Sequence, residues 1–373
     1  MSSSKEKSGV AVRLAALSHG IAAPIVCVVL AVGFLVFGSA SATLPALGIV
    51  LAGLLPVVLV VAVVIAVHHA EVIAHRLGEP FGTLVLTMAV TVIECSLILA
   101  VMLSGKGNPA LARDTVFSVI MLVVNGLVGA CFLIGGLKWG EQTFRATSAK
   151  AYLMVLIPFG VLTMVLPAFT TSAAGPFFST AQVIFVSLVT LALYATFLYV
   201  QTVRHRGFFD VEATGSEGEG TPAATGARPY LSLVATLVAI VLLSKSFAAS
   251  IETAVVAVGA PPAIVGVLVA ALVLLPESVA AIQAARADQL QRSINLALGS
   301  TLATIGLTFP TVGALSLVLG EPLVLGLGPT EMVLLALTLT VAMVTISGGR
   351  TNILSGSVHL VLLATFVFLI FAP

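Results

Sequence analysis

Two glutamates lie in the middle of long apolar stretches of the sequence. Glu94 belongs to the stretch that covers residues 82–104, and Glu277 belongs to the stretch that covers residues 262–285. An ionised carboxylate at membrane depth costs roughly 2.5–3.5 kcal/mol even on lenient insertion scales, so such groups indicate a functional site. Because burial disfavours the charged form, each group can be protonated when empty and ionised when a cation is present. The alternative is a structural acid that stays protonated.

Together, two carboxylates can hold one divalent cation or two protons at the same net charge, which is the physical basis of cation/proton exchange. Ca²⁺ takes about six to eight oxygen ligands, more than two side chains supply. Neighbouring hydroxyl and amide groups are therefore candidate ligands: Thr91, Asn125, Ser278, Ser300 and Thr304. Each has a simpler alternative role, since intramembrane hydroxyls bond to their own helix backbone and asparagine joins neighbouring helices.

A second pair of acids precedes Glu94 and Glu277: Glu71 directly follows the apolar stretch 47–70, and Glu252 lies in the stretch 230–256. Glu71 has three histidines near it in sequence, namely His68, His69 and His75. Histidine titrates near neutral pH, so a proton-entry or gating role is one interpretation, and placement at a helix interface is the other. For His359, in the last apolar stretch, a proton relay and a packed polar group both stay open.

The composition requires lipid as the main solvent of the chain. Hydrophobic residues make up 59% and charged residues 8% of the sequence, against about 25% charged residues in soluble domains. A soluble enzyme is therefore excluded. The net charge of +1 shows no bias toward nucleic acid, and there is no phosphate-binding loop for ATP. The cysteines lack metal-ligand spacing, so we expect no resident cofactor.

A bilayer core needs about 20 mostly apolar residues per helix, and eleven stretches qualify. They cover residues 21–38, 47–70, 82–104, 115–137, 150–169, 179–203, 230–256, 262–285, 294–319, 330–347 and 356–372. The expected fold is an all-α integral membrane protein with about 11 transmembrane helices.

Basic residues predict the orientation of these helices. With a cytoplasmic N-terminus and every stretch crossing, thirteen lysines and arginines fall inside and only Lys106 and Arg113 fall outside. This asymmetry is the positive-inside signal. We therefore expect a multi-pass protein of the cytoplasmic (inner) membrane, with residues 1–20 in the cytoplasm and the C-terminus outside. The lipid bilayer is the expected partner, and the sequence does not determine the oligomeric state.

The polar segment 204–228 reads as a flexible cytoplasmic linker because it is rich in glycine, alanine and acid. It separates residues 47–203 from 229–373, with five predicted helices on each side. One helix, at 21–38, precedes the first half. An odd number of helices per half means that the second half enters the membrane from the opposite side.

The same order of residues recurs in both halves, which indicates an internal repeat. Glu71 is followed by Gly78 after seven residues and then by Pro80, and Glu252 is followed by Gly259 after seven residues and then by Pro261. Glu94 and Glu277 come 14 and 16 residues after these prolines. Inverted repeats place equivalent helices together near the membrane midplane. The sequence thus predicts that Glu94 faces Glu277 across a pseudo-twofold axis.

Four short motifs resemble those of a known family: GEPFGTL at 78–84, TVIE at 91–94, PES at 276–278 and LGS at 298–300. They are similar to the cation/calcium exchanger superfamily, and specifically to its bacterial calcium/proton antiporter branch. The resemblance implies two inverted five-helix repeats after one extra helix, with Glu94 and Glu277 as the exchange acids. It also matches Glu71 and Glu252 to the acids on the preceding helix of each repeat.

The chain departs from the family pattern, because many members place Gly-Asn before the repeat acids, where this sequence has Val92-Ile93 and Leu275-Pro276. This departure concerns the identity of the cation and makes Na⁺ or K⁺ the alternative to Ca²⁺.

From the two acids and the resemblance, we predict a secondary antiporter that exports Ca²⁺ in exchange for protons. A channel and a membrane-embedded enzyme are the alternatives from other classes. No histidine near Ser96 or Ser278 in the sequence supports a nucleophile for such an enzyme.

Overall fold

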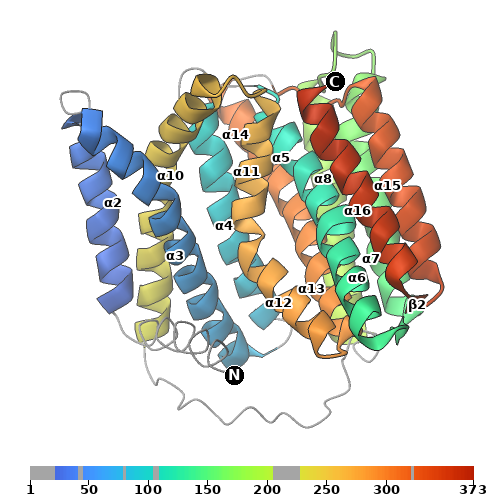
Figure 1. The fold of residues 1–373 in the computed structure, drawn as a ribbon. Helices are drawn as coiled ribbons and strands as arrows, with labels where there is room; N and C mark the ends of the chain where they lie inside the picture. Colours follow the sequence, from blue (N-terminus) through green and yellow to red (C-terminus); the bar gives the residue numbers. More distant parts are fainter. Residues whose placement is uncertain (1–21, 41–44, 79–80, 104–108, 205–226, 321–322) are drawn as a thin grey trace. The chain divides into compact units, whose positions relative to one another are not determined.

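The computed structural model of the chain describes residues 22–40, 45–78, 81–103, 109–204, 227–320 and 323–373. Almost all of these residues are helical (Figure 1). Within this part, two short strands, β1 (Gln142–Thr143) and β2 (Arg350–Thr351), form an antiparallel pair. The predicted class of an all-α membrane protein is therefore confirmed.

The described residues form two compact units, which we call unit 1 and unit 2. Unit 1 comprises residues up to 103 together with 227–251, and unit 2 comprises residues 109–204 together with the described residues from 252 onward. Each unit draws helices from both halves of the sequence. The division into the repeats 47–203 and 229–373 stays a prediction.

Unit 1 contains three helices of the first half and most of one helix of the second half. They are α2 (Ala22–Ala40), α3 (Pro45–Leu77), α4 (Phe81–Met102) and α10 (Arg228–Ala257), whose last residues belong to unit 2.

Unit 2 contains the remaining helices. From the first half come α5 (Leu111–Ile120), η1 (Met121–Leu127), α6 (Val128–Trp139), α7 (Ala146–Gly160), η2 (Val161–Val165), η3 (Leu166–Ala168), α8 (Thr180–Tyr199) and η4 (Val200–Arg204). From the second half come α11 (Ala263–Val273), α12 (Leu275–Arg286), α13 (Leu290–Ala303), η5 (Thr304–Thr308), α14 (Phe309–Leu319), α15 (Pro329–Ser347) and α16 (Ile353–Phe371).

Helical segments cover most of each of the eleven predicted apolar stretches. In the described part of the chain, nine helical spans are long and apolar enough to cross a membrane, and the pair α11 and α12 makes a tenth. The first stretch corresponds to the shorter apolar helix α2. The sequence predicted one helix over 262–285, whereas the structure bends this span by 58° between α11 and α12.

Two long spans of unit 2 change to a π-helical turn near their middle. The first runs through α5, η1 and α6, and the second runs through α13, η5 and α14. A π turn carries one extra residue per turn, and such turns occur frequently at functional sites. These two spans hold equivalent places in the two halves, so the shared interruption supports the internal repeat.

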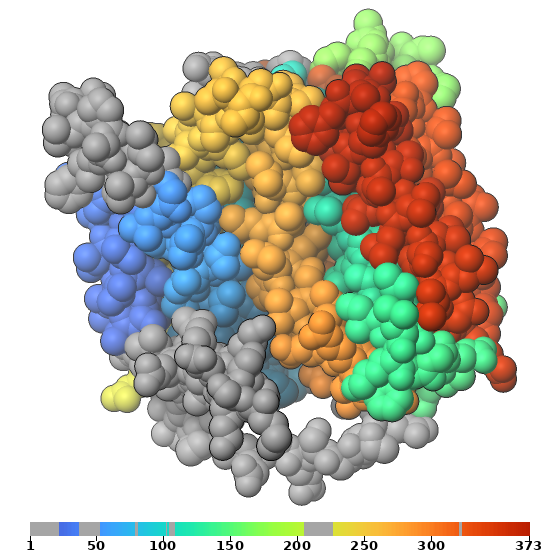
Figure 2. All heavy atoms as spheres, viewed as in Figure 1, coloured from blue at the N-terminus to red at the C-terminus, as the bar shows by residue number. Residues whose placement is uncertain are grey.

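Glycines let helices of unit 2 approach closely. A Cβ atom on Gly356 of α16 would collide with the backbone nitrogen of Leu133 and lie 2.8 Å from the carbonyl oxygen of Gly129, both on α6. The two helices lie directly against each other on the face that Figure 2 shows. Likewise, a Cβ on Gly266 of α11 would lie 2.9 Å from the backbone of Asp114 on α5. Small residues are what such close contacts between membrane helices require.

The two glycines that the repeat pairs have the same backbone conformation. Gly78 follows the end of α3 with a φ of 64°, and Gly259 follows the end of α10 with a φ of 66°. This left-handed conformation ends a helix and favours glycine. Each of the two matched glycines therefore ends the preceding helix in the same way.

Hydrogen bonds show which loops of unit 2 lie at the same end. At one end, β1 pairs with β2, and the Lys138 ammonium donates to the carbonyl oxygen of Arg286 (2.7 Å). At the other end, the backbone nitrogen of Val324 donates to Pro109 (3.1 Å), and that of Leu325 donates to Pro176 (3.0 Å). This grouping agrees with the predicted alternation of spans. Which end faces the cytoplasm stays a prediction.

Some sequence predictions concern residues outside the described ranges. These are the N-terminal segment 1–20, Glu79 and Pro80 of the first motif, Lys106, Arg206, and residues 205–226 of the linker.

Thiol accessibility tests the predicted orientation. Glu141→Cys introduces a thiol in the exposed turn after α6, and Ala174→Cys introduces one in the exposed segment before α8. In intact cells we expect a membrane-impermeant maleimide to label only the second variant, and to label both after permeabilisation. The native cysteines Cys27, Cys95 and Cys131 are buried and give a low background. The reverse labelling pattern would overturn the orientation.

Candidate functional site

Glu94 lies on the continuous helix α4 of unit 1 and is only 1% exposed. Its helix forms because the stretch is apolar throughout, with the tight turn at Gly78 and Gly82 before it, where the Gly82 nitrogen donates to the Gly78 carbonyl (2.6 Å). One turn before Glu94, the Thr91 hydroxyl donates to the carbonyl oxygen of Thr87 (2.9 Å). This hydrogen bond within its own helix is the simpler alternative that the sequence left open for Thr91. A hydroxyl oxygen that donates in this way still has lone pairs with which to bind a cation.

The second acid of unit 1, Glu71, is exposed on α3. His69 is 6% exposed, and its ring centroid lies 5.7 Å from that of His68. Among the described residues there is no cluster of three or more His, Cys, Asp or Glu side chains that could hold a metal ion.

Glu277 lies in the first turn of α12, directly after a break in the helical span of unit 2. Helix α11 ends at Val273, and Pro276 occupies the first turn of α12, where proline is favoured because its φ is already helical. The residue is half-buried, and its Oε2 atom is buried. The break places this side chain at a helix N-terminus, the end of the helix dipole that interacts favourably with negative charge. Helix α4 has no corresponding break at Glu94.

Helix α12 packs against α13, α6 and the π-helical segment η1. Ser278 follows Glu277 and is half-buried. Ser300 of α13 is half-buried, and Thr304, four residues further at the start of η5, is 3% exposed. Unit 2 thus places Glu277, Ser278 and Ser300 on two neighbouring helices. Glu252, also assigned to unit 2, is half-buried near the end of α10.

Asn125 is fully buried in η1, and both polar atoms of its amide are hydrogen-bonded. Its nitrogen donates to the Thr338 hydroxyl of α15 (2.8 Å), and its oxygen accepts from the Nδ1 atom of His359 on α16 (3.2 Å). The structure therefore shows Asn125 joining helices, which is the alternative to a cation ligand. His359 is itself fully buried and packed, with a second contact to Thr345.

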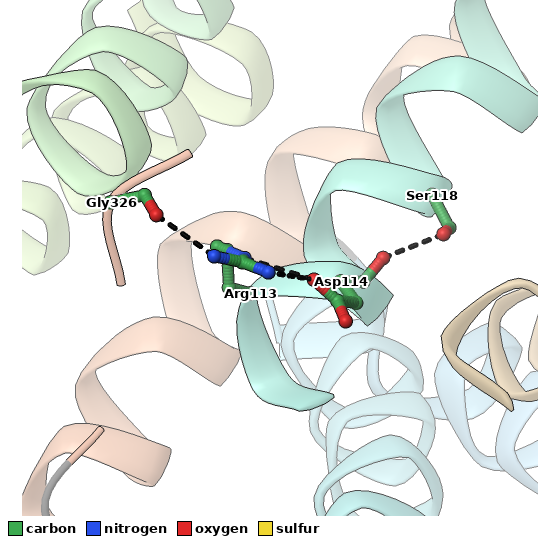
Figure 3. Close-up of polar contacts among 4 residues, drawn as sticks. All are labelled: Arg113, Asp114, Ser118 and Gly326. Atoms are coloured by element: carbon green, nitrogen blue, oxygen red, sulfur yellow. Dashed lines mark hydrogen bonds and ion pairs between the residues drawn. The ribbon is translucent and has the colours of Figure 1, made fainter. Parts of the chain in front are cut away.

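An ion pair that the sequence analysis did not single out lies at the start of α5 (Figure 3). The Arg113 guanidinium donates from Nε (2.9 Å) and Nη2 (2.7 Å) to Asp114 Oδ1, and from Nη1 to the carbonyl oxygen of Gly326 (3.0 Å). One turn further along the helix, Ser118 donates to the Asp114 carbonyl (2.6 Å). Arg113 thereby joins α5 to the segment before α15. The signal in the sequence was an Arg-Asp pair at the border of an apolar stretch.

A second unpredicted feature fixes the far end of α12. The Gln142 side chain is 2% exposed, and its amide nitrogen donates to Asp288 (2.7 Å) and to the carbonyl oxygen of Ala285 (3.5 Å). Asp288 follows α12 with a φ of 60°. Helix α12, whose first turn contains Glu277, is therefore held at its other end by β1.

The structure groups the predicted site residues by unit. Unit 1 holds Glu94 with Thr91, and separately Glu71. Unit 2 holds Glu277, Ser278, Ser300, Thr304, Asn125 and Glu252. The pairing of Glu94 with Glu277 stays a prediction.

Comparisons with known proteins identify close relatives. The family model described as sodium/calcium exchanger protein matches residues 45–203 and 229–372. The chain is 44% identical to a putative ionic transporter of Sinorhizobium fredii, over 84% of this chain and 86% of that protein. It is 40% identical to the sodium-potassium/proton antiporter ChaA of Escherichia coli, over 82% of this chain and 84% of that protein. A Ca²⁺/H⁺ antiporter of Bacillus subtilis is 24% identical, over 65% and 69%.

Solved structures share the fold. The structure of native YfkE matches with a TM-score of 0.72 at 18% sequence identity, covering 94% of this chain and 100% of that chain. The H⁺/Ca²⁺ exchanger CAX matches with a TM-score of 0.57 at 14% identity, covering 90% and 88%. At these identities the likeness shows the helical fold alone.

The role of Gln142 can be tested through stability. We expect Gln142→Ala to lower the free energy of unfolding by about 1–3 kcal/mol, because it leaves buried polar groups without their partner. Thermal unfolding of the purified protein in detergent measures this as a lower midpoint. The control is Gln283→Ala, since Gln283 is exposed on α12. Equal midpoints for the two variants would show that Gln142 does not stabilise this end of the helix.

Proposed function

Because the chain belongs to the sodium/calcium exchanger protein family, we propose that it is a secondary antiporter that exchanges a metal cation for protons across the membrane. The observation that carries this proposal is the burial of Glu94, which is 1% exposed within an apolar membrane-spanning helix. A carboxyl group at such a position is costly and indicates an ion or proton site. Glu277 is the second acid of the proposed site.

The proposed exchange follows from charge balance. With both carboxylates ionised, the site holds two negative charges and attracts a cation. With both protonated, the site is neutral and can return across the membrane without the cation. Each protonation state thus corresponds to one cargo, and a rigid-body movement of one repeat against the other would open the site to alternate sides.

Oxygen atoms beside the two acids complete the proposed site. Thr91 lies one turn before Glu94, Ser278 follows Glu277, and Ser300 and Thr304 lie on the span that packs against α12. We assign these hydroxyl groups as further cation ligands. Asn125 enters the proposal as a support of the site, because its amide already bonds to Thr338 and His359.

Glu71 and Glu252 are proposed to serve proton entry or gating. Glu71 is exposed on α3, in the same helical segment as His68, His69 and His75. Histidine is the side chain whose ordinary charge change lies nearest neutral pH. Glu252 holds the matching place before Gly259 in the second half.

The relatives change the order of the two candidate cations. The relative that is 40% identical is named a sodium-potassium/proton antiporter, whereas those named Ca²⁺/H⁺ antiporters are 24% identical. We therefore propose Na⁺ and K⁺ as the main cations, with Ca²⁺, the cation that the sequence alone favoured, as the second candidate. The bacterial relatives support placement in the cytoplasmic membrane, with export of the cation in exchange for external protons.

Proton flux in liposomes tests the proposed exchange. Purified protein is reconstituted with an acidic lumen and a trapped pH dye, and Na⁺, K⁺, Ca²⁺ or Mg²⁺ is added outside. We expect Na⁺, K⁺ or Ca²⁺ to alkalinise the lumen, because cation entry drives protons out. Glu94→Gln and Glu277→Gln should each abolish the signal, since a neutral amide can neither carry the proton nor balance the cation.

A matched control separates the exchange acids from other glutamates. Glu141→Gln removes an exposed carboxylate that pairs loosely with Arg350 (3.8 Å), and we expect exchange at the wild-type rate. If no cation moves protons although the protein is folded and inserted, the antiporter proposal is wrong, and a channel or an enzyme must be considered.

Chemical bridging tests whether Glu94 and Glu277 face each other. In a background with Cys27, Cys95 and Cys131 replaced by alanine, we expect the double variant Glu94→Cys with Glu277→Cys to be bridged within one chain by a short dithiol-reactive reagent. A protease site inserted in the linker 204–228 converts bridging into a shift on a denaturing gel. Each single variant is the control. A double variant that never bridges would contradict the proposed pairing.

A further inference from the structure

Four polar side chains, three of them buried, form a hydrogen-bonded group within unit 2, which we call the His359 clasp: Asn125, Thr338, Thr345 and His359. It joins η1 to α15 and α16. Asn125, Thr338 and His359 are each fully buried. A titratable side chain inside a membrane helix bundle is rare and indicates a functional role. The proposed exchange reaction does not itself use His359.

The hydrogen-bond partners determine which ring nitrogen of His359 carries the hydrogen. An amide oxygen can only accept, so the Nδ1 atom that faces Asn125 Oδ1 at 3.2 Å must donate. The Nε2 atom lies 2.8 Å from the Thr345 hydroxyl, whose single hydrogen reaches either the Val341 carbonyl oxygen at 2.9 Å or, after rotation about the C–O bond, the Nε2 atom. The neutral ring with hydrogen on Nδ1 therefore satisfies both contacts, without placing a charge in the bundle.

The position of the ring is closely defined by its neighbours. A Cβ on Gly129 would lie 2.8 Å from the Cβ of His359, so α6 and α16 are in contact at the base of the side chain. The edge of the Phe132 ring meets the imidazole with centroids 6.0 Å apart. His359 consequently presents its Nδ1 atom to Asn125 from a fixed direction.

Through Asn125, the clasp holds a π-helical turn. In η1 the Val128 nitrogen donates to the carbonyl oxygen five residues earlier, on Val123, instead of four residues earlier. Such turns are rare and appear mostly as single turns inside α-helices. Asn125 lies within this turn and links it to two other helices, through Thr338 and His359.

The held turn supports the helices that carry the proposed ligands. Segment η1 packs against α12, whose first turn contains Glu277, and against α13, which carries Ser300. We propose that His359 is a positioning residue for cation binding: by donating its Nδ1–H to Asn125, it fixes η1 and thereby the helices of Glu277 and Ser300. This inference rests on the proposed antiport function.

Three substitutions of one residue test the proposal. His359→Asn places an amide nitrogen where Nδ1 lies and keeps a donor for Asn125. His359→Gln extends further and can reach only Thr345, and His359→Phe removes both hydrogen bonds. Cation-dependent proton flux in liposomes gives the apparent KM for Na⁺, K⁺ and Ca²⁺ and the maximal rate for each variant.

We expect His359→Phe and His359→Gln to raise the apparent KM by about 10–100-fold, the usual effect of removing a group that orients ligands. The maximal rate should change much less, and His359→Asn should retain a KM close to wild type. As a control, Thr190→Val removes a fully buried hydroxyl that bonds only to the backbone of its own helix, at Val186 and Ser187, and should leave KM unchanged.

Several outcomes would overturn the proposal. An unchanged KM in His359→Phe or His359→Gln, with a wild-type protein that exchanges cations, refutes positioning and leaves the antiport function standing. If His359→Asn loses proton coupling as severely as His359→Phe, His359 carries protons instead of positioning η1. If His359→Phe does not fold, the comparison of His359→Asn with His359→Gln carries the test. A folded wild type that moves no cation overturns both the function and this inference.

Discussion

The cost of an ionised carboxylate in a low-dielectric membrane is the constraint on which the rest of this structure depends. Glu94 is almost completely buried on an unbroken helix, whereas Glu277 stands at the N-terminus of a helix that follows a 58° bend. The bend places Glu277 at the N-terminal end of a helix dipole, whereas Glu94 lies within a continuous helix. The two acids therefore occupy unequal environments, although the sequence predicts matching places for them in an internal repeat.

Much of unit 2 holds the helix of Glu277 in place. At its far end Gln142 bonds to Asp288 and Ala285, and along its length it packs against η1, which the His359 clasp stabilises. Close glycine contacts between α6 and α16 bring His359 within reach of Asn125. In unit 2 these polar contacts lie at a π turn and at the end of α12, where the backbone departs from a regular α-helix.

The family match and the symmetry of the chain support each other. Gly78 and Gly259 adopt the same left-handed conformation, and equivalent spans contain the π turns η1 and η5. The match to the exchanger family covers both halves and leaves out the linker. The relatives also favour Na⁺ and K⁺ over Ca²⁺ as the proposed cations. The choice of cation by such a site depends on the number and arrangement of its ligand oxygens and not on the two acids alone.

The sequence by itself predicted where the apolar helical stretches lie, because apolar length and glycine or proline ends are local properties. It also singled out Glu94 and Glu277, since a charge in an apolar stretch is visible without any fold. Only the tertiary structure decided that the 262–285 span bends, that Asn125 bonds to His359 and Thr338, and that Gln142 holds the end of α12. These features join residues more than 140 positions apart in the case of Gln142 and Asp288, and more than 200 in the case of Asn125. Such partners depend on helix packing, which no local pattern of residues encodes.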